Sequence, residues 1–482
     1  MKVARLPALA TALAVSGCAT ISPEQGHAEV DRLVEQRIGG RTAWDRGAPT
    51  DEAIAGRVAN LLEGGLTRER AVAIALVNNP TLQATYEELG VSQADLVQAG
   101  LLSNPTLSAS LGFPEGGGRK AYDASLVQSF LDVFVLPLRK RVAREQFTAD
   151  TLRVAHDALG VAAQTSVQVA AVQATTQTVE LDRLALEAER AAANLAERRY
   201  RAGNITDLEL AMARTQYEQA KLELAQAELR LSEEREALNQ LLGLWGPQTG
   251  WELSELLPEL PAEEAPLDGL ERTAIAQRLD VDAARKQALL MSNAVDLARS
   301  TRLFGLVEVG VEVEQDPEGT RLFGPTLSLQ LPLFDRRQAV IARLEAQKRQ
   351  SERRLLAIAV EVRSHVRLAR ARLLAARQRV EHYRKVLLPL HESVVAQAQL
   401  QYNAMQLGLG ELLRARRAQL AARRAYIDEV RGYWAERAEL ERVMGGRLDR
   451  PAAGPKPGVD QAPKAPEPEP TAPEENHEHH TS

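Results

Sequence analysis

The chain alternates apolar and polar residues in four short stretches. The clearest is LFGLVEVGVEVE, residues 303–314, in which one face is apolar or glycine and the other carries Glu308, Glu312 and Glu314. A period of two predicts a β-strand whose faces point in opposite directions. Residues 322–334 alternate similarly, and 105–113 and 122–134 are strand-like stretches nearer the N-terminus. The stretch 122–134 does not keep one phase, so its register is not predicted.

Between these strands lie long segments rich in Ala, Leu, Glu, Arg and Gln, a composition typical of long helices or coiled coils. The predicted helices cover about 67–100, 137–202, from the break at 203–204 to 242, 269–300, 336–403, and from the break at 408–410 to 444. Thr67 is the expected N-cap of the first helix, and Pro389 should bend the fifth. A helix of about 65 residues is roughly 100 Å long, so the long helices must pack side by side.

Two breaks separate consecutive long helices. The first is Gly203-Asn204, after which Thr206 or Asp207 can cap the next helix. The second lies near Gly408-Leu409-Gly410, with Met405 where Gly203 would align. These breaks predict two helical hairpins with sharp turns.

The chain is an internal duplication. The segment opening at Tyr200 matches one opening at Tyr402 at a constant offset of 202 residues, and earlier parts match at an offset of 199. This period is too long for a solenoid. The expected organisation is a signal peptide at 1–17, a lipidated N-terminal segment at 18–65, a first repeat at 66–243, a connector at 244–268, a second repeat at 269–444 and a disordered tail at 445–482.

The strands raise the question of which solvent each face meets. Alternation alone leaves a soluble sandwich and membrane strands equally open, although about 11 alternating residues is the length that a spanning strand needs. Six of the seven phenylalanines lie in or beside the strands, which favours aromatic girdles at a bilayer. Four strands cannot close a barrel, because about eight are needed. Spanning strands would therefore require several protomers, and the glutamates would then line a pore.

The acidic face is expected from one repeat only. The matching positions of the first-half strand are Ser108, Ser110 and Gly112, which carry no charge. We therefore predict that any acidic ring comes from the second half of each protomer.

The N-terminus has the pattern of a targeting segment. Two positive charges precede a short apolar run from Leu6 to Val15, and Cys18, the only cysteine, stands where cleavage would occur. The spacing resembles a bacterial lipobox, which would make Cys18 the lipidated first residue of the mature chain. The alternative is a chance cysteine in an ordinary signal peptide. Ala19 after the cysteine favours the outer membrane, by resemblance to bacterial lipoproteins.

These features together resemble the bacterial outer membrane efflux protein family, the TolC-like channels. The motifs that carry the resemblance are ALVNNPTL at 75–82, NPTL at 104–107, YRAG at 200–203 and LQLPLF at 329–334, whose order and spacing cover nearly the whole ordered chain. The resemblance implies a mainly α fold with a membrane β-barrel portion. Three protomers would form a twelve-stranded barrel in the outer membrane and an α-helical barrel across the periplasm.

The resemblance also implies partners. A periplasmic adaptor protein and an inner-membrane pump would dock below a homotrimer, at tips formed by Gly203, Asn204, Thr206, Gly408 and Gly410. Carboxylates after the second break can form a gate in this family, and Glu411 is the best match. Arg414 at the next gate position breaks an all-acidic ring. The alternative is that both are ordinary solvated helix charges.

Three classes of function compete. Passive conduction in a tripartite efflux system leads, and a periplasmic coiled-coil lipoprotein scaffold without a pore is the alternative. An enzyme is disfavoured because no HExxH, phosphate loop or nucleophile elbow occurs, and no cofactor is expected. Nucleic-acid binding lacks a basic patch with aromatics. His477, His479 and His480 in the tail could bind metal, and metal cations compete with organic compounds as cargo.

Overall fold

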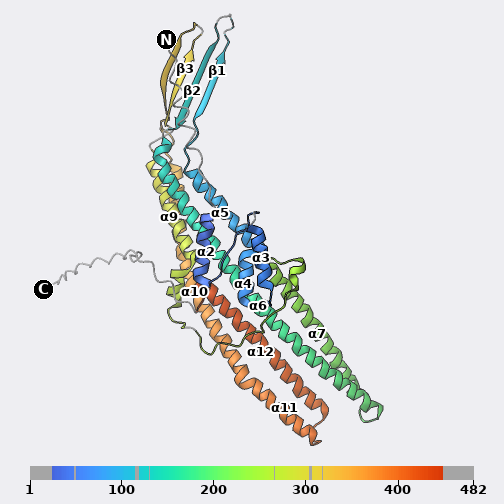
Figure 1. Cartoon of the computed structure of the whole chain (residues 1–482). Coiled ribbons are helices and arrows are strands. Elements are labelled where there is room, and N and C mark those ends of the chain that lie inside the picture. The colour runs from blue at the N-terminus through green and yellow to red at the C-terminus, as the bar shows by residue number, and fades with distance from the viewer. Residues whose placement is uncertain are drawn as a thin grey trace, which may run out of the picture.

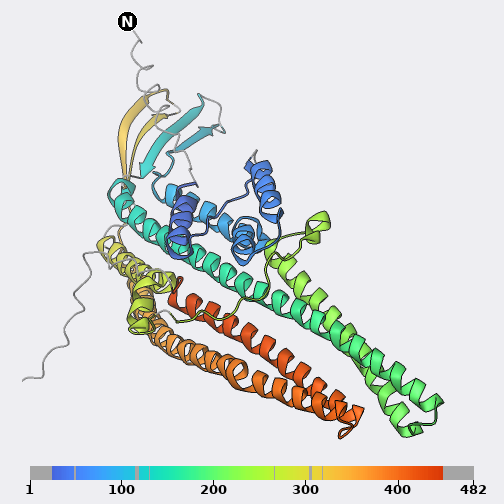
Figure 2. The same cartoon turned by 60° about the horizontal axis from the view of Figure 1, so that its bottom comes forward.

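The computed structural model describes residues 24–47, 50–113, 115, 119–129, 131–264, 266–302, 307–316 and 318–448. The predicted signal peptide, Cys18 and the three tail histidines lie outside these residues. The molecule is a long rod with a small sheet at one end and two helical hairpins at the other (Figures 1 and 2). Among the described residues, no helix is both long enough and apolar enough to cross a membrane.

The two repeats are built from the same elements in the same order. The first contains α4 (Arg68–Asn78), α5 (Pro80–Ala99), β1 (Thr106–Gly112), β2 (Ala121–Ser129), α6 (Leu131–Arg201) and α7 (Asp207–Leu242). The second contains α8 (Leu270–Gln277), α9 (Leu279–Ser300), β3 (Val307–Gln315), β4 (Arg321–Leu329), α10 (Gln338–His382), η2 (Tyr383–Leu387), α11 (Leu388–Asn403) and α12 (Leu409–Met444). Outside the repeats lie α2 (Glu24–Ile38), α3 (Thr50–Leu62) and, in the connector, η1 (Gly246–Gly250).

Each predicted helix that precedes the strands is in fact two helices. In the first repeat Pro80 forces Asn79 into an extended conformation (φ −66°, ψ 119°). The Asn79 side chain then caps α5 by accepting from the Leu82 amide at 2.8 Å. In the second repeat Arg278 adopts the same conformation (φ −68°, ψ 127°) without a proline. Thr67 caps α4 as predicted, accepting from the Arg70 amide.

The duplication extends to single hydrogen bonds. The Asn79 side-chain amide donates to the Leu241 carbonyl at 2.8 Å, and the Arg278 guanidinium donates to the Val443 carbonyl at 3.1 Å. These two pairs are equivalent under the offsets of the repeat. The first hydrogen bond joins the start of α5 to the end of α7, and the second joins the start of α9 to the end of α12. The same contact therefore fixes the last helix of each repeat.

Two predicted strand ends were wrong. The stretch 122–134 ends as a strand at Ser129, and α6 begins at Leu131, so that Pro137 lies inside this helix rather than at its start. Residues 131–136 read LDVFVL, which has no alternation to hold them in a sheet. The stretch 322–334 ends as a strand at Leu329, and Pro332 beyond it could not donate to a ladder.

The core lies in the middle of the rod, where the short helices surround the long ones. One cluster packs α2 and α5 against α6 around Val34 and Tyr86, and another packs α4 against α6 and α7 around Ile74 and Leu238. A third joins α8, α10 and α12 around Leu373. The sheet and the hairpins project from this core in opposite directions (Figure 1).

The second long helix contains a single wide turn. Its buried stripe follows heptad spacing through Val362, Val366, Ala369, Leu373, Ala376 and Val380, then resumes 15 residues later at Val395. Two heptads would require 14, so one residue is extra, and η2 absorbs it as a π-helical segment in which the Leu388 amide donates to the Tyr383 carbonyl. The segment ends two residues before Pro389, where we predicted a bend.

Candidate functional site

The four strands form one antiparallel sheet in the order β1-β2-β3-β4. Directly paired residues share a face, so the register assigns every side chain. Glu308, Glu312 and Glu314 of β3 pair with Ser129, Ser125 and Asp123 of β2, and with Ser328, Gly324 and Leu322 of β4. The three glutamates therefore lie together on a face that is mostly polar.

Asp123 is a fourth carboxylate on this face. It lies opposite Glu314 and, on the other side, opposite Ser110 of β1. The expectation that only the second repeat contributes acid to this face was therefore wrong. The phase of residues 122–134 was obscured by Val127, which occupies a polar-face position, and by four residues that belong to α6. Read over 121–129 alone, the alternation of β2 is recognisable.

The opposite face of the sheet is apolar and exposed. It carries Leu107 and Leu111 of β1, Leu126 of β2, Val309 and Val311 of β3, and Phe323, Leu327 and Leu329 of β4. Leu107 and Leu327, on the two edge strands, are each 73% exposed. Within the described residues no further strand pairs with β1 or β4. The sheet thus has an uncovered apolar face and two open edges.

Exposed phenylalanines stand at both ends of the sheet. Phe113 and Phe323 lie at the hairpin end, whereas Phe134 and Phe334 lie at the helix end. Phe130 and Phe304 lie outside the described residues. These four phenylalanines therefore lie beside the strands, as the sequence predicted, and they lie at both ends of the apolar face.

The first helical tip is a hydrogen-bonded turn. Gly203 adopts a left-handed conformation (φ 72°), and its amide donates to the Tyr200 carbonyl at 2.8 Å. Thr206 caps α7 as predicted: its hydroxyl accepts from the Glu209 amide, and the Glu209 carboxylate accepts from the Thr206 amide at 2.9 Å. The Thr206 amide and hydroxyl both donate to the Glu209 carboxylate, and these two hydrogen bonds lower the pKa of Glu209.

The second tip repeats this turn with different residues. Met405 takes the left-handed conformation (φ 58°) in place of Gly203, and its amide donates to the Tyr402 carbonyl at 3.0 Å. Gly408 stands at the N-cap position that corresponds to Thr206 and has no side chain to cap α12. Gly410, predicted to belong to the break, instead lies in the first turn of α12.

Glu411 and Arg414, the candidate gate residues, are neighbours on the first two turns of α12. A guanidinium nitrogen of Arg414 lies 3.0 Å from the Glu411 carboxylate, and both side chains are exposed. Each charge therefore has a partner within one protomer, and Glu411 is not an isolated acid.

The two hairpins are joined by two ion pairs in which the carboxylate is buried and the arginine is partly exposed. Arg417 of α12 lies 2.8 Å from the buried Glu189 of α6, and Arg424 lies 2.5 Å from the buried Asp182. The pairs are seven residues apart on both helices and run in opposite directions, so α6 and α12 pack antiparallel. Burial raises the pKa of Asp182 although Arg424 opposes this. Between the tips, a cavity of about 230 Å³ is lined by α6, α7 and α12.

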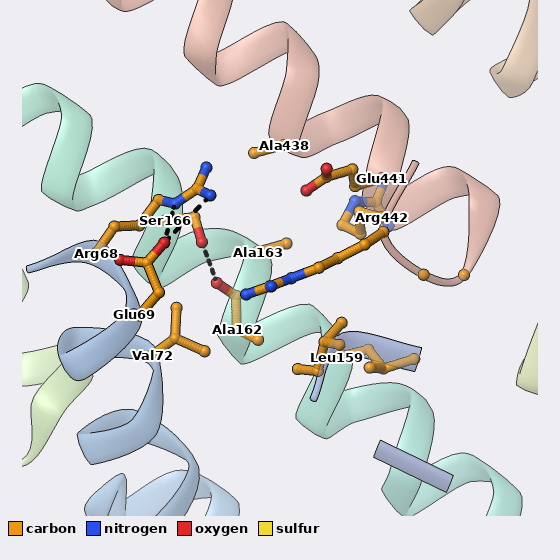
Figure 3. A pocket seen from close by; sticks show the side chains of 14 residues that line it. Arg68, Glu69, Val72, Leu159, Ala162, Ala163, Ser166, Ala438, Glu441 and Arg442 are labelled. Atoms are coloured by element: carbon orange, nitrogen blue, oxygen red, sulfur yellow. Dashed lines mark hydrogen bonds and ion pairs between the residues drawn. The ribbon is translucent and has the colours of Figure 1, made fainter. Parts of the chain in front are cut away.

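A smaller hollow lies where the repeats meet, between α2, α4, α6 and the end of α12 (Figure 3). The charged groups around it are Arg68, Glu69, Glu441, Arg442 and Arg447. Arg68 donates to Glu69, and burial raises the pKa of Glu441. Within the part of the chain that the structure describes, no three His, Cys, Asp or Glu side chains are placed to hold a metal ion. We find no arrangement of a nucleophile, base and oxyanion site in these two hollows.

Comparison with known families shows which class of protein the chain resembles. Residues 71–244 match the model of the outer membrane efflux protein family. The resemblance predicted from the sequence is confirmed, because this part of the chain is similar to the outer membrane efflux family.

Individual relatives refine this result. The chain is 26% identical over 390 residues to the cobalt-zinc-cadmium resistance protein CzcC of Cupriavidus metallidurans, a match covering 79% of this chain and 90% of that protein. The outer membrane channel CmeC of Campylobacter jejuni superimposes with a TM-score of 0.68 at 15% identity, covering 86% of this chain and 91% of CmeC. The transmembrane channel CusC gives 0.65 at 18% identity, covering 81% and 92%. The two structures establish the fold alone.

Proposed function

We propose that this chain is the outer-membrane channel of a tripartite efflux system and conducts exported substrate passively from periplasm to exterior. The observation that carries the proposal is the two-sided sheet, with an exposed apolar face, a polar face bearing four carboxylates and two open edges. Such a face is stable against lipid and costly against water. The longest helices, at roughly 100 Å, are suited to cross the periplasm.

Open edges require other copies of the chain. Unpaired strand groups cannot remain in a bilayer, and four strands are too few for a closed barrel. A homotrimer would supply twelve strands, which is the assembly that the family resemblance implies. The exposed leucines and methionine of α7, at Leu208, Met212, Leu222 and Leu229, follow coiled-coil spacing and would pack against a neighbouring protomer.

The sheet would place its carboxylates inside the pore. Glu308, Glu312, Glu314 and Asp123 from each protomer would then give the lumen a negative potential that favours cations. Metal cations are the cargo that we propose, because CzcC, the relative at 26% identity, is by name a cobalt-zinc-cadmium resistance protein. An organic cargo remains the competing assignment that transport assays would distinguish.

We propose that Cys18 carries the lipid anchor and that the adaptor, acting with an inner-membrane pump, docks at the tips around Gly203 and Gly408. Palmitate labelling should be lost in a Cys18→Ser variant. Unchanged labelling of that variant would contradict the anchor.

Single-channel recording in planar bilayers tests the main proposal. Purified full-length protein should form a cation-selective pore, and joint replacement of Glu308, Glu312 and Glu314 by Gln, with Asp123→Asn, should reduce that selectivity. Glu318→Gln, outside the strands, is the matched control and should leave it unchanged. A pore whose selectivity ignores all four replacements would contradict the lumen assignment. A protein that never conducts, and that is soluble without its anchor, would favour the scaffold.

A further inference from the structure

The two ends of the sheet differ in charge. On the helix side, segments 95–105, 130–145, 296–306 and 330–345 contain nine Lys and Arg residues against six Asp and Glu. On the hairpin side, segments 113–120 and 315–321 contain three of each. Both ends border the same apolar face, so the composition of the sheet does not explain why their charges differ.

Six basic side chains on the helix side are exposed and form what we call the proximal belt. Its members are Lys140, Arg141 and Arg144 of α6, Arg302 after α9, and Arg336 and Arg343 near the start of α10. Among the described residues, none of the six has a carboxylate within ion-pair distance. The ends of these helices gather directly below the sheet (Figure 1).

Most carboxylates near this belt are already engaged. Glu345 lies 2.6 Å from Arg299, and Glu145 lies 3.1 Å from Lys286. Asp335 accepts from the backbone amide of Arg337 at 2.7 Å. Among the residues that the structure describes, Asp95, Asp296 and Asp335 are exposed without a basic partner, but three carboxylates cannot balance six basic side chains. The belt therefore presents an excess of uncompensated positive charge.

The belt is continuous with apolar surface. Phe334, at 93% exposure, precedes Arg336 by two residues, and the exposed Leu331 and Leu333 continue toward the strand. Lys and Arg can lay their stems along apolar surface while their charged heads reach water. Basic residues beside a membrane surface attract anionic lipids, and each side chain raises the affinity about fivefold. An apolar surface bordered by basic groups thus matches the boundary between lipid tails and anionic headgroups.

We propose that the proximal belt binds the headgroups of anionic phospholipids in the leaflet that faces the helices. This inference rests on the proposed function, because the sheet must span the membrane to bring the belt to that leaflet. The belt would fix the depth of the channel in the membrane and recruit a negatively charged lipid shell. The balanced charge of the hairpin side predicts no such preference there.

The test uses full-length oligomer in mild detergent and two fluorescent lipids with identical tails, phosphatidylglycerol and phosphatidylcholine. The native protein should prefer phosphatidylglycerol, and added salt should weaken that preference. The variant Arg302→Gln/Arg336→Gln/Arg343→Gln should lose about fivefold for each side chain that reaches a headgroup. The variant Arg119→Gln/Lys120→Gln/Arg321→Gln removes the same charge from the hairpin side and should keep the preference.

The inference is overturned if the native protein binds both lipids equally, or if the two variants lose the preference to the same extent, which would indicate net charge alone. Conductance of the same preparation separates this result from the proposed function. If the preparation conducts but shows no lipid preference, the proposed role of the belt is contradicted and the proposed channel function is not. A preparation with neither pores nor preference would overturn both.

Discussion

The turn at Met405 offers a direct measurement of backbone strain. Its left-handed conformation (φ 58°) costs a residue with a Cβ about 1–2 kcal/mol. The side chain is 94% exposed, so its removal sacrifices little packing. Glycine adopts this conformation freely, but it adds about 0.4–1 kcal/mol of freedom to the unfolded chain. Met405→Gly should therefore stabilise the turn between α11 and α12 by roughly 0.5–1 kcal/mol.

The first repeat supplies the reciprocal experiment. Gly203 occupies the equivalent turn (φ 72°), and a Cβ added there would meet no atom within 4 Å. Gly203→Met should thus destabilise its own turn through the backbone alone, by a similar amount. Hydrogen exchange followed by mass spectrometry, on peptides covering each turn of the full-length protein, should show roughly two- to fivefold slower exchange in the first variant and faster exchange in the second.

The signs of the two effects decide the result. If Met405→Gly leaves exchange unchanged or accelerates it, Met405 makes a contact that the isolated protomer lacks, and the strain argument fails. If both substitutions accelerate exchange, interactions other than the backbone conformation of the native residue stabilise each turn.

Three further outcomes are expected. Gly243→Ala should destabilise by more than about 1 kcal/mol, since the residue has φ 66° and an added Cβ would overlap the Asn78 carbonyl oxygen; denaturant midpoints measure this. Arg424→Ala should cost about 3 kcal/mol by leaving Asp182 buried and unpaired, and adding Asp182→Asn should recover part of that loss in a double-mutant cycle. Burial lowers the pKa of His27, so its contribution to stability is complete above about pH 6.5 and is lost as pH falls toward the folded pKa; His27→Gln should flatten the acid side of a melting-temperature profile.

The sequence predicted those features that have a strong local signal. Alternation in residues 307–315 and 321–329, the turn at Gly203 and the cap at Thr206 all depend on a few neighbouring residues and were found. The repeat itself was visible because its offset is constant. The assignment of Glu308, Glu312 and Glu314 to one face followed from the period of a strand.

Other features depend on contacts that a local pattern does not contain. The break at Arg278 has no proline, and it is held by hydrogen bonds to Asp280 and to the distant Val443 carbonyl. Asp123 joined the acidic face only through pairing with β3. The ion pair of Arg424 with the buried Asp182 joins residues on separate helices, each of which resembles an ordinary solvated charge in the sequence.

The wide turn at Tyr383–Leu387 has a consequence for the length of this helix. Elsewhere along α10, deleting one residue would rotate everything beyond it by about 100° and turn the apolar stripe away from its partner. Within this segment the same deletion would remove the extra residue, restore the 14-residue spacing between Val380 and Val395, and leave the stripe in place. The second hairpin therefore contains one position where the chain can be shortened by a residue while the packing below it keeps its orientation.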